Sequence, residues 1–568
     1  MLNTVAPRPC GTAQQTRSAL GTLREAAASR LRRLECPASL LCVLSAAYVV
    51  LVNNSRMFGL LDERMDLGTV SGLAGFAAVF LGLTGMVAVS LLLVGGKYVL
   101  KPAVIVLLVL SAGLGYFTNA CGVVFDLKMI ENIAETFADR NTREAKEILS
   151  APLALRLLLL GVLPSVLVGL TTIRWRSARR EVLERSIYAG GMLVVFALLV
   201  LPNYRFMLFF GRENVRIKYY ATPTHALNSL RKFVVAGLRR EKPFAALGQD
   251  AVQNRKGRPR RVGIMVVGET ARADHFSLNG YPRQTNPCLE QRRLLNYTRT
   301  TSSGTSTSFS VPCMFSFLTR RHFTPQKGAS QSNVLDVLHQ AGVRVVWIDN
   351  NSSDKGVCAR IGSINLQHSP DPASPHYAHG GYYDEVLLEG LGSHLEGTDA
   401  DVLIVLHTMG SHGPAYHRRY PPRFAKFRPF CGHDAPQHAS IEEVVNAYDN
   451  TILYTDFVLD RMIAFLESID GSCETFLYYV SDHGESLGEN GVYLHGLPDV
   501  LAPAAQTHVP MLVWMSDRTA AVVAPDMALL QGRVDEPTSH DNVAHTLLGL
   551  FDVKTDLYRR ELDLLRGK

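Results

Sequence analysis

Apolar residues concentrate in five long runs within the first two hundred positions of the chain. The runs cover residues 37–51, 68–95, 102–120, 151–173 and 187–201. A helix needs about 20 mostly apolar residues to cross a bilayer. The three middle runs have close to that length, and the first and last reach it with flanking polar residues. Because one half of the chain holds all five runs, they predict a membrane domain of five helices rather than buried core helices.

The Lys and Arg residues between these runs alternate in number from one loop to the next. Six arginines precede the first run and five lie within residues 174–185, whereas the loop 121–150 has four basic residues against six acidic ones. Loops rich in Lys and Arg stay in the cytoplasm. We therefore expect a basic cytoplasmic N-terminus at 1–36, a transmembrane domain at 37–204, and the rest of the chain outside.

A basic connector follows at residues 205–261. It holds fourteen Lys and Arg against three acidic residues, whereas the whole chain carries a net charge of only +7. Within it, apolar residues recur at helical spacing at Ala226, Leu227, Leu230, Phe233, Val234 and Leu238. This pattern predicts an amphipathic helix on the membrane surface, with an ordinary solvated linker as the alternative.

From residue 262 to 568 short β-rich runs alternate with helical patterns. The predicted strands are 262–267, 343–348, 402–406, 476–480 and 509–514, and the clearest helices are 333–340 and 441–466. This alternation predicts an α/β domain with a mostly parallel central sheet covered by helices. The 45 Gly and 27 Pro are near average usage, which excludes a fibrous or low-complexity chain. In such sheets the ligand site lies past the carboxyl ends of the strands.

Side chains that suit a metal ion follow three of these predicted strands. They are Glu269, His412, Asp482, His483 and His495. Carboxylates and imidazoles together favour zinc or a similar divalent ion. A single Asp–His pair is most often part of a solvated loop, but several such groups at one sheet edge predict a metal site.

A dense cluster of hydroxyls could supply a reacting group. Residues 298–310 hold ten Ser or Thr in thirteen positions, and the apolar run 312–318 that follows predicts a helix. The hydroxyls would then cap a helix N-terminus, which attracts phosphate. A hydroxyl there, beside zinc, is a plausible nucleophile, but spacing alone does not choose among the ten.

Four longer motifs resemble the signature of the phosphoethanolamine transferases. They are VGETARADH at 267–275, GTST at 304–307, MGSHGP at 409–414 and SDHGESLGENG at 481–491. The sequence is most similar to the lipid A phosphoethanolamine transferases, a group that includes the mobile colistin-resistance enzymes. The resemblance covers residues 38–555.

This resemblance implies an alkaline-phosphatase-like catalytic domain in the periplasm, anchored in the bacterial inner membrane by a multi-pass domain. It implies a zinc ion held by Glu269, Thr307, Asp482 and His483, with Thr307 as the nucleophile. It places His412 and His495 near the phosphate, where they bind substrate or hold a second zinc. The implied partners are the membrane and its lipids, with no nucleic acid, and the implied state is a monomer.

The segment MIENIAET at 129–136 resembles the family's donor-headgroup loop, and Asn132 and Thr136 match it. The family has a Glu four residues further on, where this chain has Arg140; Glu144 is the candidate replacement. The cysteines also depart from the family, which usually pairs them around the nucleophile loop. Cys313 remains, but Ser303 stands at its partner's position, and Cys358 and Cys431 lack near partners.

The implied reaction moves phosphoethanolamine from phosphatidylethanolamine to a phosphate of lipid A and releases diacylglycerol. A phosphoethanolamine–threonine intermediate would form on the way, and the product would bind polymyxins less tightly. Three alternatives stay open: transfer to another envelope acceptor such as a core heptose or a protein, a membrane-bound phosphatase or sulfatase, and a non-catalytic binding protein.

The charge alternation predicts that Arg180 is cytoplasmic and Lys256 lies outside. Single cysteines at these positions, treated with an impermeant thiol reagent in intact spheroplasts, test this topology. We expect labelling at position 256 and none at 180. Labelling at 180 but not at 256 would contradict five crossings.

Overall fold

The computed structural model describes residues 35–138, 150–237, 243–255, 257–368, 370–434 and 436–566. Its contacts divide the chain into two compact units. The first comprises residues up to Asn119 together with Ala151–Leu227, and the second comprises Ala120–Ser150 together with Asn228–Lys568. The segment that resembles the donor-headgroup loop therefore packs with the second unit. Arg140, Glu144 and Lys256 lie outside the described residues.

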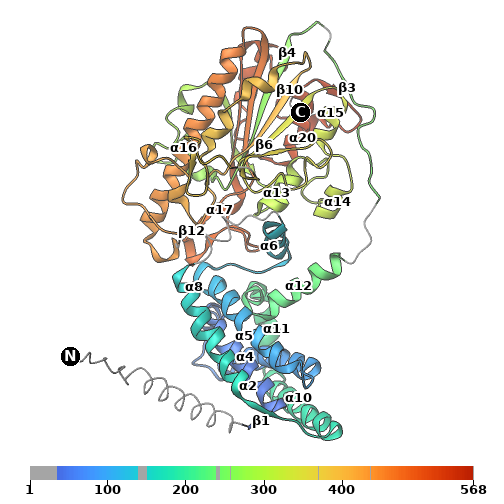
Figure 1. Ribbon diagram of the computed structural model, residues 1–568, viewed down its shortest axis with the longest axis vertical. Helices are drawn as coiled ribbons and strands as arrows, with labels where there is room; N and C mark the ends of the chain where they lie inside the picture. Colours follow the sequence, from blue (N-terminus) through green and yellow to red (C-terminus); the bar gives the residue numbers. More distant parts are fainter. Residues whose placement is uncertain are drawn as a thin grey trace, which may run out of the picture. The chain divides into compact units, whose positions relative to one another are not determined.

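The first unit is helical throughout most of its length (Figure 1). Its helices are α2 (Ala38–Asn53), α3 (Ser55–Asp62), α4 (Val70–Val94), α5 (Leu100–Tyr116), η1 (Phe117–Cys121), α8 (Ala151–Arg156), η2 (Leu157–Val162), α9 (Leu163–Leu170), α10 (Ala178–Val200), α11 (Tyr204–Glu213) and η3 (Val215–Tyr220). Helix α12 (Thr224–Gly237) follows and contains most of the residues predicted to form the amphipathic helix; the division between the two units falls within it, after Leu227. A short pair of parallel strands, β1 (Glu35–Pro37) and β2 (Thr172–Arg174), completes the unit.

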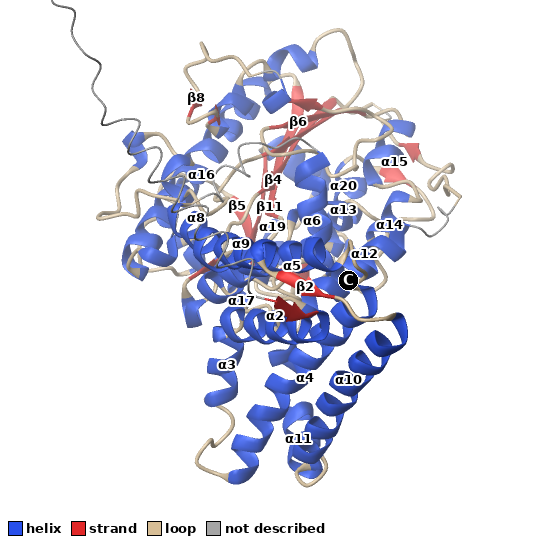
Figure 2. Cartoon of the chain, turned by 60° about the horizontal axis from the view of Figure 1, so that its bottom comes forward, coloured by secondary structure: helices blue, strands red, loops and turns tan. Residues whose placement is uncertain are grey.

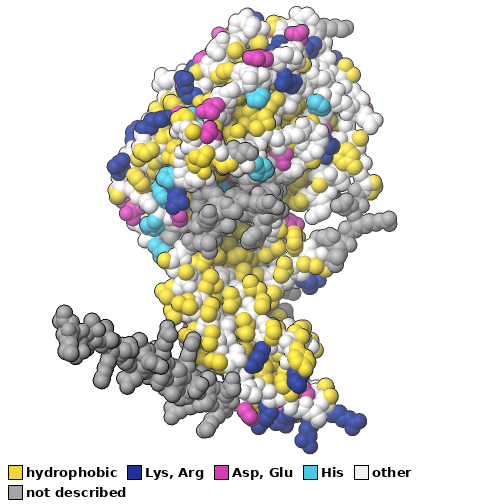
Figure 3. All heavy atoms as spheres, viewed as in Figure 1, with side chains coloured by type: hydrophobic (Ala, Val, Ile, Leu, Met, Phe, Trp, Pro, Cys, Tyr) yellow, Lys and Arg dark blue, Asp and Glu magenta, His cyan; other side chains and the backbone are white. Residues whose placement is uncertain are grey.

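Four helical segments of the described chain are long and apolar enough to span a membrane. They are Val70–Val94, Leu100–Cys121, Ala151–Leu170 and Ala178–Val200. Helices α2 and α3 qualify together as a fifth, with a bend of 68° between them. Exposed apolar side chains such as Ile187, Leu193 and Leu198 cover α10, and Figure 3 shows hydrophobic side chains over much of this unit. Such a surface suits lipid rather than water.

The break between α2 and α3 has a local cause at Asn54, whose side chain is buried. Asn54 Nδ2 donates to the carbonyls of Val50 at 2.8 Å and Thr222 at 2.7 Å, and its Oδ1 accepts from Thr222 N at 2.6 Å. A side-chain amide that bonds to backbone groups competes with the helical hydrogen bonds and favours a helix end. The first apolar run is therefore bent at its polar exit.

Helix α10 begins nine residues before the predicted start of the last apolar run. Arg179, Arg180 and Arg185 lie in its first turns rather than in a loop. Arg185 donates to the carbonyls of Leu92 at 2.5 Å and Gly95 at 2.7 Å, at the end of α4. Arginine is a good helix former and its long side chain reaches toward polar groups, so an apolar run marks only part of the helix.

The second unit is built on a central sheet, which Figure 2 shows in red. The sheet has eight strands in the order β15-β5-β14-β11-β4-β10-β6-β7. The strands are β4 (Arg260–Gly268), β5 (Leu294–Thr301), β6 (Arg344–Asp349), β7 (Ile364–Asn365), β10 (Val402–His407), β11 (Cys473–Ser481), β14 (His508–Met515) and β15 (Thr538–Ser539). Strands β11, β4, β10, β6 and β7 are parallel, and β14 is antiparallel to both β11 and β5. The predicted mostly parallel sheet is confirmed.

Helices cover both faces of this sheet. Side chains on both sides of the central strands are therefore apolar, and these strands appear in the sequence as continuous apolar runs. Helix α16 (Ile441–Ile469) packs on one face, and α13 (Thr307–Met314), α15 (Val334–Gln340) and α20 (Asp541–Leu550) contribute to the core on the other. Capping boxes begin α15 and α16, where Asn333 pairs with Asp336 and Ser440 with Glu443. Both predicted helices are confirmed.

Short elements complete the second unit. They are α6 (Leu127–Ala138), β3 (Val252–Gln253), α14 (Pro325–Ala329), β8 (Tyr377–Ala378), β9 (Gly381–Tyr382), β12 (Ser486–Leu487), β13 (Tyr493–Leu494), α17 (Ala504–Thr507), α18 (Asp517–Val523), α19 (Met527–Gln531) and β16 (Val553–Lys554). The eight cysteines in the described part of the chain form no disulfide bonds with one another.

The predicted helix at 312–318 is wrong in its bounds. Helix α13 begins at Thr307 and ends at Met314, with Pro312 inside it. Ser306 has extended backbone angles, φ −146° and ψ 145°, so the helical conformation starts one residue later. The hydroxyl cluster is thus divided between the strand β5, a loop, and the first turn of α13. This Ser- and Thr-rich segment is ordered because most of it is buried, and composition alone does not reveal burial.

A buried ion pair joins two central strands, and its loss should destabilise the domain. Arg261 Nε donates to Glu474 Oε2 at 2.8 Å, and each side chain is 1% exposed. We expect Glu474→Ala to lower the free energy of unfolding by about 3–5 kcal/mol, because it leaves a buried guanidinium unpaired. Thermal unfolding followed by tryptophan fluorescence measures this. Asp517→Ala, at an exposed pair with Arg293, is the control and should change stability far less.

Candidate active site

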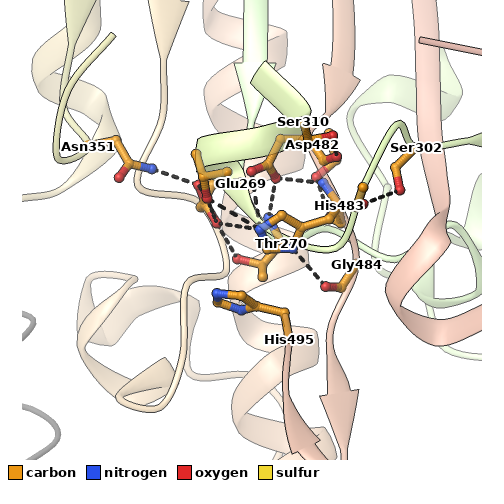
Figure 4. Close-up of polar contacts among 12 residues, drawn as sticks. Glu269, Thr270, Ser302, Ser310, Asn351, Asp482, His483, Gly484 and His495 are labelled. Atoms are coloured by element: carbon orange, nitrogen blue, oxygen red, sulfur yellow. Dashed lines mark hydrogen bonds and ion pairs between the residues drawn. The ribbon is translucent and has the colours of Figure 1, made fainter. Parts of the chain in front are cut away.

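The carboxyl ends of the parallel strands bring the predicted ligands together. Glu269 follows β4, Asp482 and His483 follow β11, and His412 lies in the turn after β10. These strands are neighbours in the sheet, and their carboxyl ends share one edge. Side chains from distant parts of the sequence therefore meet there, as Figure 4 shows.

Glu269, Asp482 and His483 form a buried cluster that could hold a metal ion. Their ligand atoms all lie within 4.8 Å of one another. Asp482 Oδ1 accepts hydrogen bonds from Thr270 N at 3.1 Å and His483 N at 2.7 Å, but Oδ2 accepts none from the described residues. A buried carboxylate oxygen without a donor is costly, so it fits a bound cation.

The imidazole of His483 presents a lone pair to this cluster. Its Nδ1 lies 2.9 Å from the carbonyl of Gly484, which only accepts, so Nδ1 carries the proton. Its Nε2 lies 3.2 Å from Asp482 Oδ2 and 3.6 Å from Glu269 Oε1. Burial lowers the pKa of His483 to about 4, which keeps the ring neutral. A neutral imidazole with its second nitrogen bonded to a carbonyl is oriented as a metal ligand.

Glu269 is held by an amide that sequence reasoning missed. Asn351 Nδ2 donates to Glu269 Oε2 at 2.8 Å, and Thr270 Oγ1 donates to Oε1 at 3.2 Å. Burial and the nearby Asp482 carboxyl raise the pKa of Glu269, and a bound cation would reverse this effect. The position of Asn351, two residues after β6 at the same sheet edge, is the signal that could have identified it.

Thr307 is the hydroxyl that meets the cluster. Its Oγ1 lies 3.2 Å from Glu269 Oε2 and 3.3 Å from His483 Nε2. Other hydroxyls of the segment are bonded elsewhere: Thr305 Oγ1 donates to the carbonyl of Leu497 at 2.7 Å, and Ser310 Oγ to that of Asp482 at 2.5 Å. The tertiary structure therefore distinguishes Thr307 from its neighbours, which spacing did not.

Two further histidines lie beside the cluster. The ring centroid of His495 is 4.3 Å from that of His483 and 5.4 Å from that of His412. Glu485, which sequence reasoning did not select, is buried with Oε2 3.4 Å from His495 Nδ1. Burial, together with His495 and Arg419, lowers the pKa of His412, and burial raises the pKa of Glu485.

The segment that resembles the donor-headgroup loop forms part of α6, which packs against α13. Asn132 is half-buried there, and the side chain of Thr136 lies outside the described residues. A Cβ on Gly496 would come within 2.7 Å of Met129 Cε, so α6 reaches the residue next to His495. Glu131 lines a cavity of about 440 Å³ together with Ser308, Phe309, Pro312 and Lys355.

Two family models match this chain. The sulfatase model matches residues 261–553, and the model described as phosphoethanolamine transferase EptA/EptB matches residues 83–237. The fold and the site therefore define a sulfatase-like α/β enzyme whose chain also contains membrane-spanning helices.

Similarity to known proteins specifies the family. The chain is 34% identical over 534 residues to the phosphoethanolamine transferase EptA of Escherichia coli K12, covering 92% of this chain and 96% of that one. It is 35% identical to phosphatidylethanolamine transferase Mcr-1 of Escherichia coli, covering 92% and 97%. The solved structure of the integral membrane lipooligosaccharide phosphoethanolamine transferase A from Neisseria meningitidis matches with a TM-score of 0.88 and 32% identity, covering 93% and 98%.

The chain belongs to the EptA and Mcr family of phosphoethanolamine transferases. It is an integral membrane enzyme with its soluble domain in the periplasm. The predicted reaction class, fold and location are confirmed.

If the predicted zinc ion occupies the buried cluster, the geometry identifies the substitutions that would release it. Asp482→Ala and His483→Ala each remove one donor, so both zinc content and transfer activity should fall. His412→Ala should keep the zinc and lose only activity, since its ring lies outside the cluster. Elemental analysis of the purified variants measures this, and full zinc occupancy in the first two variants would exclude the assigned site.

Proposed function

We propose that this enzyme transfers phosphoethanolamine from phosphatidylethanolamine to a phosphate of lipid A through a covalent intermediate on Thr307. The observation that carries the proposal is the contact of Thr307 Oγ1 with both Glu269 and His483 in a buried cluster. The names of relatives support the substrates: Mcr-1 is called a phosphatidylethanolamine transferase, and the neisserial enzyme acts on lipooligosaccharide. Less negative lipid A would bind polymyxins more weakly.

Zinc fits the donor set formed by Glu269, Asp482 and His483, with Thr307 as a fourth ligand. Two carboxylates and a neutral imidazole are usual zinc ligands, and Asp482 Oδ2 lacks a hydrogen-bond donor. Bound there, zinc would favour the ionised Thr307 hydroxyl and stabilise negative charge on the transferred phosphoryl group. His412 and His495 then remain available for substrate.

Thr307 would act as the nucleophile. Its Oγ1 forms a bond to the phosphorus of phosphatidylethanolamine while the bond from phosphorus to the diacylglycerol oxygen breaks. The Thr307 proton has an acceptor in Glu269 Oε2, 3.2 Å away. A phosphate oxygen of the acceptor lipid then displaces Thr307 Oγ1, which takes its proton back.

The leaving diacylglycerol oxygen needs a proton, and the geometry favours His495 over His412 as its source. Glu485 Oε2 lies 3.4 Å from His495 Nδ1, where the carboxyl group orients the ring. Burial, together with the neighbouring His495 and Arg419, instead lowers the pKa of His412. In this assignment His495 is the general acid and a neutral His412 contacts the phosphate.

The cavity beside α13 supports the binding of the donor headgroup near Thr307. It is lined by the second residue of that helix, Ser308, by Glu131 of α6 and by Lys355. The Glu131 carboxylate suits the ammonium group of ethanolamine, and the Lys355 side chain suits its phosphate. Asn132 and Thr136 on α6 are proposed to contact this headgroup, as the family motif implies.

Covalent catalysis predicts a defined set of outcomes for Thr307. Incubation of the wild-type enzyme with a phosphatidylethanolamine analogue and no acceptor should release diacylglycerol and leave a phosphoethanolamine mass on the peptide with Thr307. Thr307→Ala should abolish both, whereas Thr307→Ser keeps the oxygen and should retain a little activity. Thr305→Ala is the matched control and should lose less. Normal turnover in Thr307→Ala would refute the covalent mechanism.

The same variants test the acceptor. Mass spectrometry of lipid A from cells that express the wild type should show added phosphoethanolamine, which cells with Thr307→Ala lack. A relative from Salmonella typhimurium, 27% identical to this chain, is named Kdo(2)-lipid A phosphoethanolamine 7''-transferase, so a core sugar is the competing acceptor. Phosphoethanolamine on core sugars or on a protein, with lipid A unmodified, would exclude the proposed acceptor and keep the chemistry.

A further inference from the structure

His540 is a buried histidine that contacts three segments around the buried cluster. It immediately precedes helix α20 and is 0% exposed. Its Nδ1 lies 3.0 Å from the backbone N of Ser303, in the loop before Thr307, and its Nε2 lies 2.9 Å from the carbonyl of Ser481. Its own backbone N donates to the carbonyl of Thr301 at 3.3 Å.

These partners fix the protonation state of the ring. The Ser303 N–H can only donate, so Nδ1 must be unprotonated, and the Ser481 carbonyl can only accept, so Nε2 must carry the proton. Burial also lowers the pKa of His540 to about 4. A neutral ring of one tautomer is therefore the state that satisfies both bonds.

The two bonds join the nucleophile segment to the metal-ligand segment. Ser303 lies four residues before Thr307, and Ser481 is the last residue of β11, directly before Asp482 and His483. Ser310, one turn after Thr307 on α13, lies 3.2 Å from His540 Nδ1 and donates to the carbonyl of Asp482. Figure 4 shows Ser310 beside Asp482.

We infer that His540 is a positioning residue, which holds the loop before Thr307 in register with the end of β11 that carries Asp482 and His483. The inference rests on the proposed role of Thr307 as the nucleophile. Cys313 on α13 forms no disulfide with another described cysteine, and Ser303 holds this loop only through non-covalent contacts. The hydrogen bonds of His540 supply a fixed link at that place.

Loss of this link should affect the rate rather than donor binding. A displacement of the nucleophile by about 1 Å can lower a rate by about 100-fold. The proposed donor contacts lie on α6, α13 and the loop of Lys355, and the ligand side chains of the metal remain. We therefore expect His540→Ala to lower kcat about 100-fold, with KM and zinc content little changed.

Two conservative variants separate the two bonds. In His540→Asn the amide oxygen can take the place of Nδ1 and accept from Ser303 N–H, whereas in His540→Gln the amide nitrogen can take the place of Nε2 and donate to Ser481. If His540 acts by holding the nucleophile loop, the kcat of His540→Asn should be about tenfold higher than that of His540→Ala. The kcat of His540→Gln should rise less. His545→Ala is the matched control. His545 lies on α20 and is buried like His540, but its Nδ1 accepts from Arg559 N at 3.2 Å rather than from the nucleophile loop.

The experiment uses the full-length enzyme in detergent, with a fluorescent phosphatidylethanolamine as the donor. It measures kcat, KM, zinc content and thermal midpoint for the wild type and the four variants. The expected result is a kcat loss in His540→Ala well beyond that in His545→Ala at a similar thermal midpoint, with partial rescue by Asn. Equal kcat in the two alanine variants, rescue by Gln at least as good as by Asn, or parallel loss of zinc would overturn the inference. An inactive wild type would instead refute the proposed function.

Discussion

The burial of two carboxylates against one another at the edge of the sheet is the constraint on which the rest of the site depends. Glu269 and Asp482 are 1% and 0% exposed, and burial with mutual repulsion raises the pKa of Glu269. Such a pair needs compensation, which comes here from amide donors such as Asn351 and the Thr270 backbone, and which the proposed zinc ion would complete. Thr307 then meets a polarising environment that an exposed hydroxyl lacks.

This arrangement follows from parallel strands that end at the same edge. Strand β4 lies between β10 and β11, so residues just past their ends converge. Glu269 and Thr307 are 38 positions apart, and Thr307 and His483 are 176 positions apart, yet each pair is in contact. Asn351 donates to Glu269, and Glu485 lies beside His495. Groups held in this way need less reorganisation when charge develops in a reaction.

The membrane helices obey a different constraint, since lipid offers no hydrogen bonds to backbone groups. Apolar runs therefore predicted the spans well, but polar residues set their ends. Asn54 interrupts the first run because its amide bonds to backbone groups of Val50 and Thr222. Arg185 extends α10 beyond its apolar part because its side chain reaches the end of α4.

The sequence by itself determined the apolar spans, the β-rich runs of the sheet, the reaction class and the motif residues from Glu269 to His495, because each of these is encoded by local pattern or a continuous motif. Only the tertiary structure decided the strand order and the start of α13 at Thr307. It also showed that, among the hydroxyls of this segment, Thr307 contacts Glu269 and His483. It further revealed the contacts of Asn351 with Glu269 and of His540 with Ser303 and Ser481, since Asn351 and His540 stand in no shared motif with those residues. The physical reason is that these choices depend on contacts between segments far apart in the chain, which arise when the sheet buries its faces and aligns its strand ends.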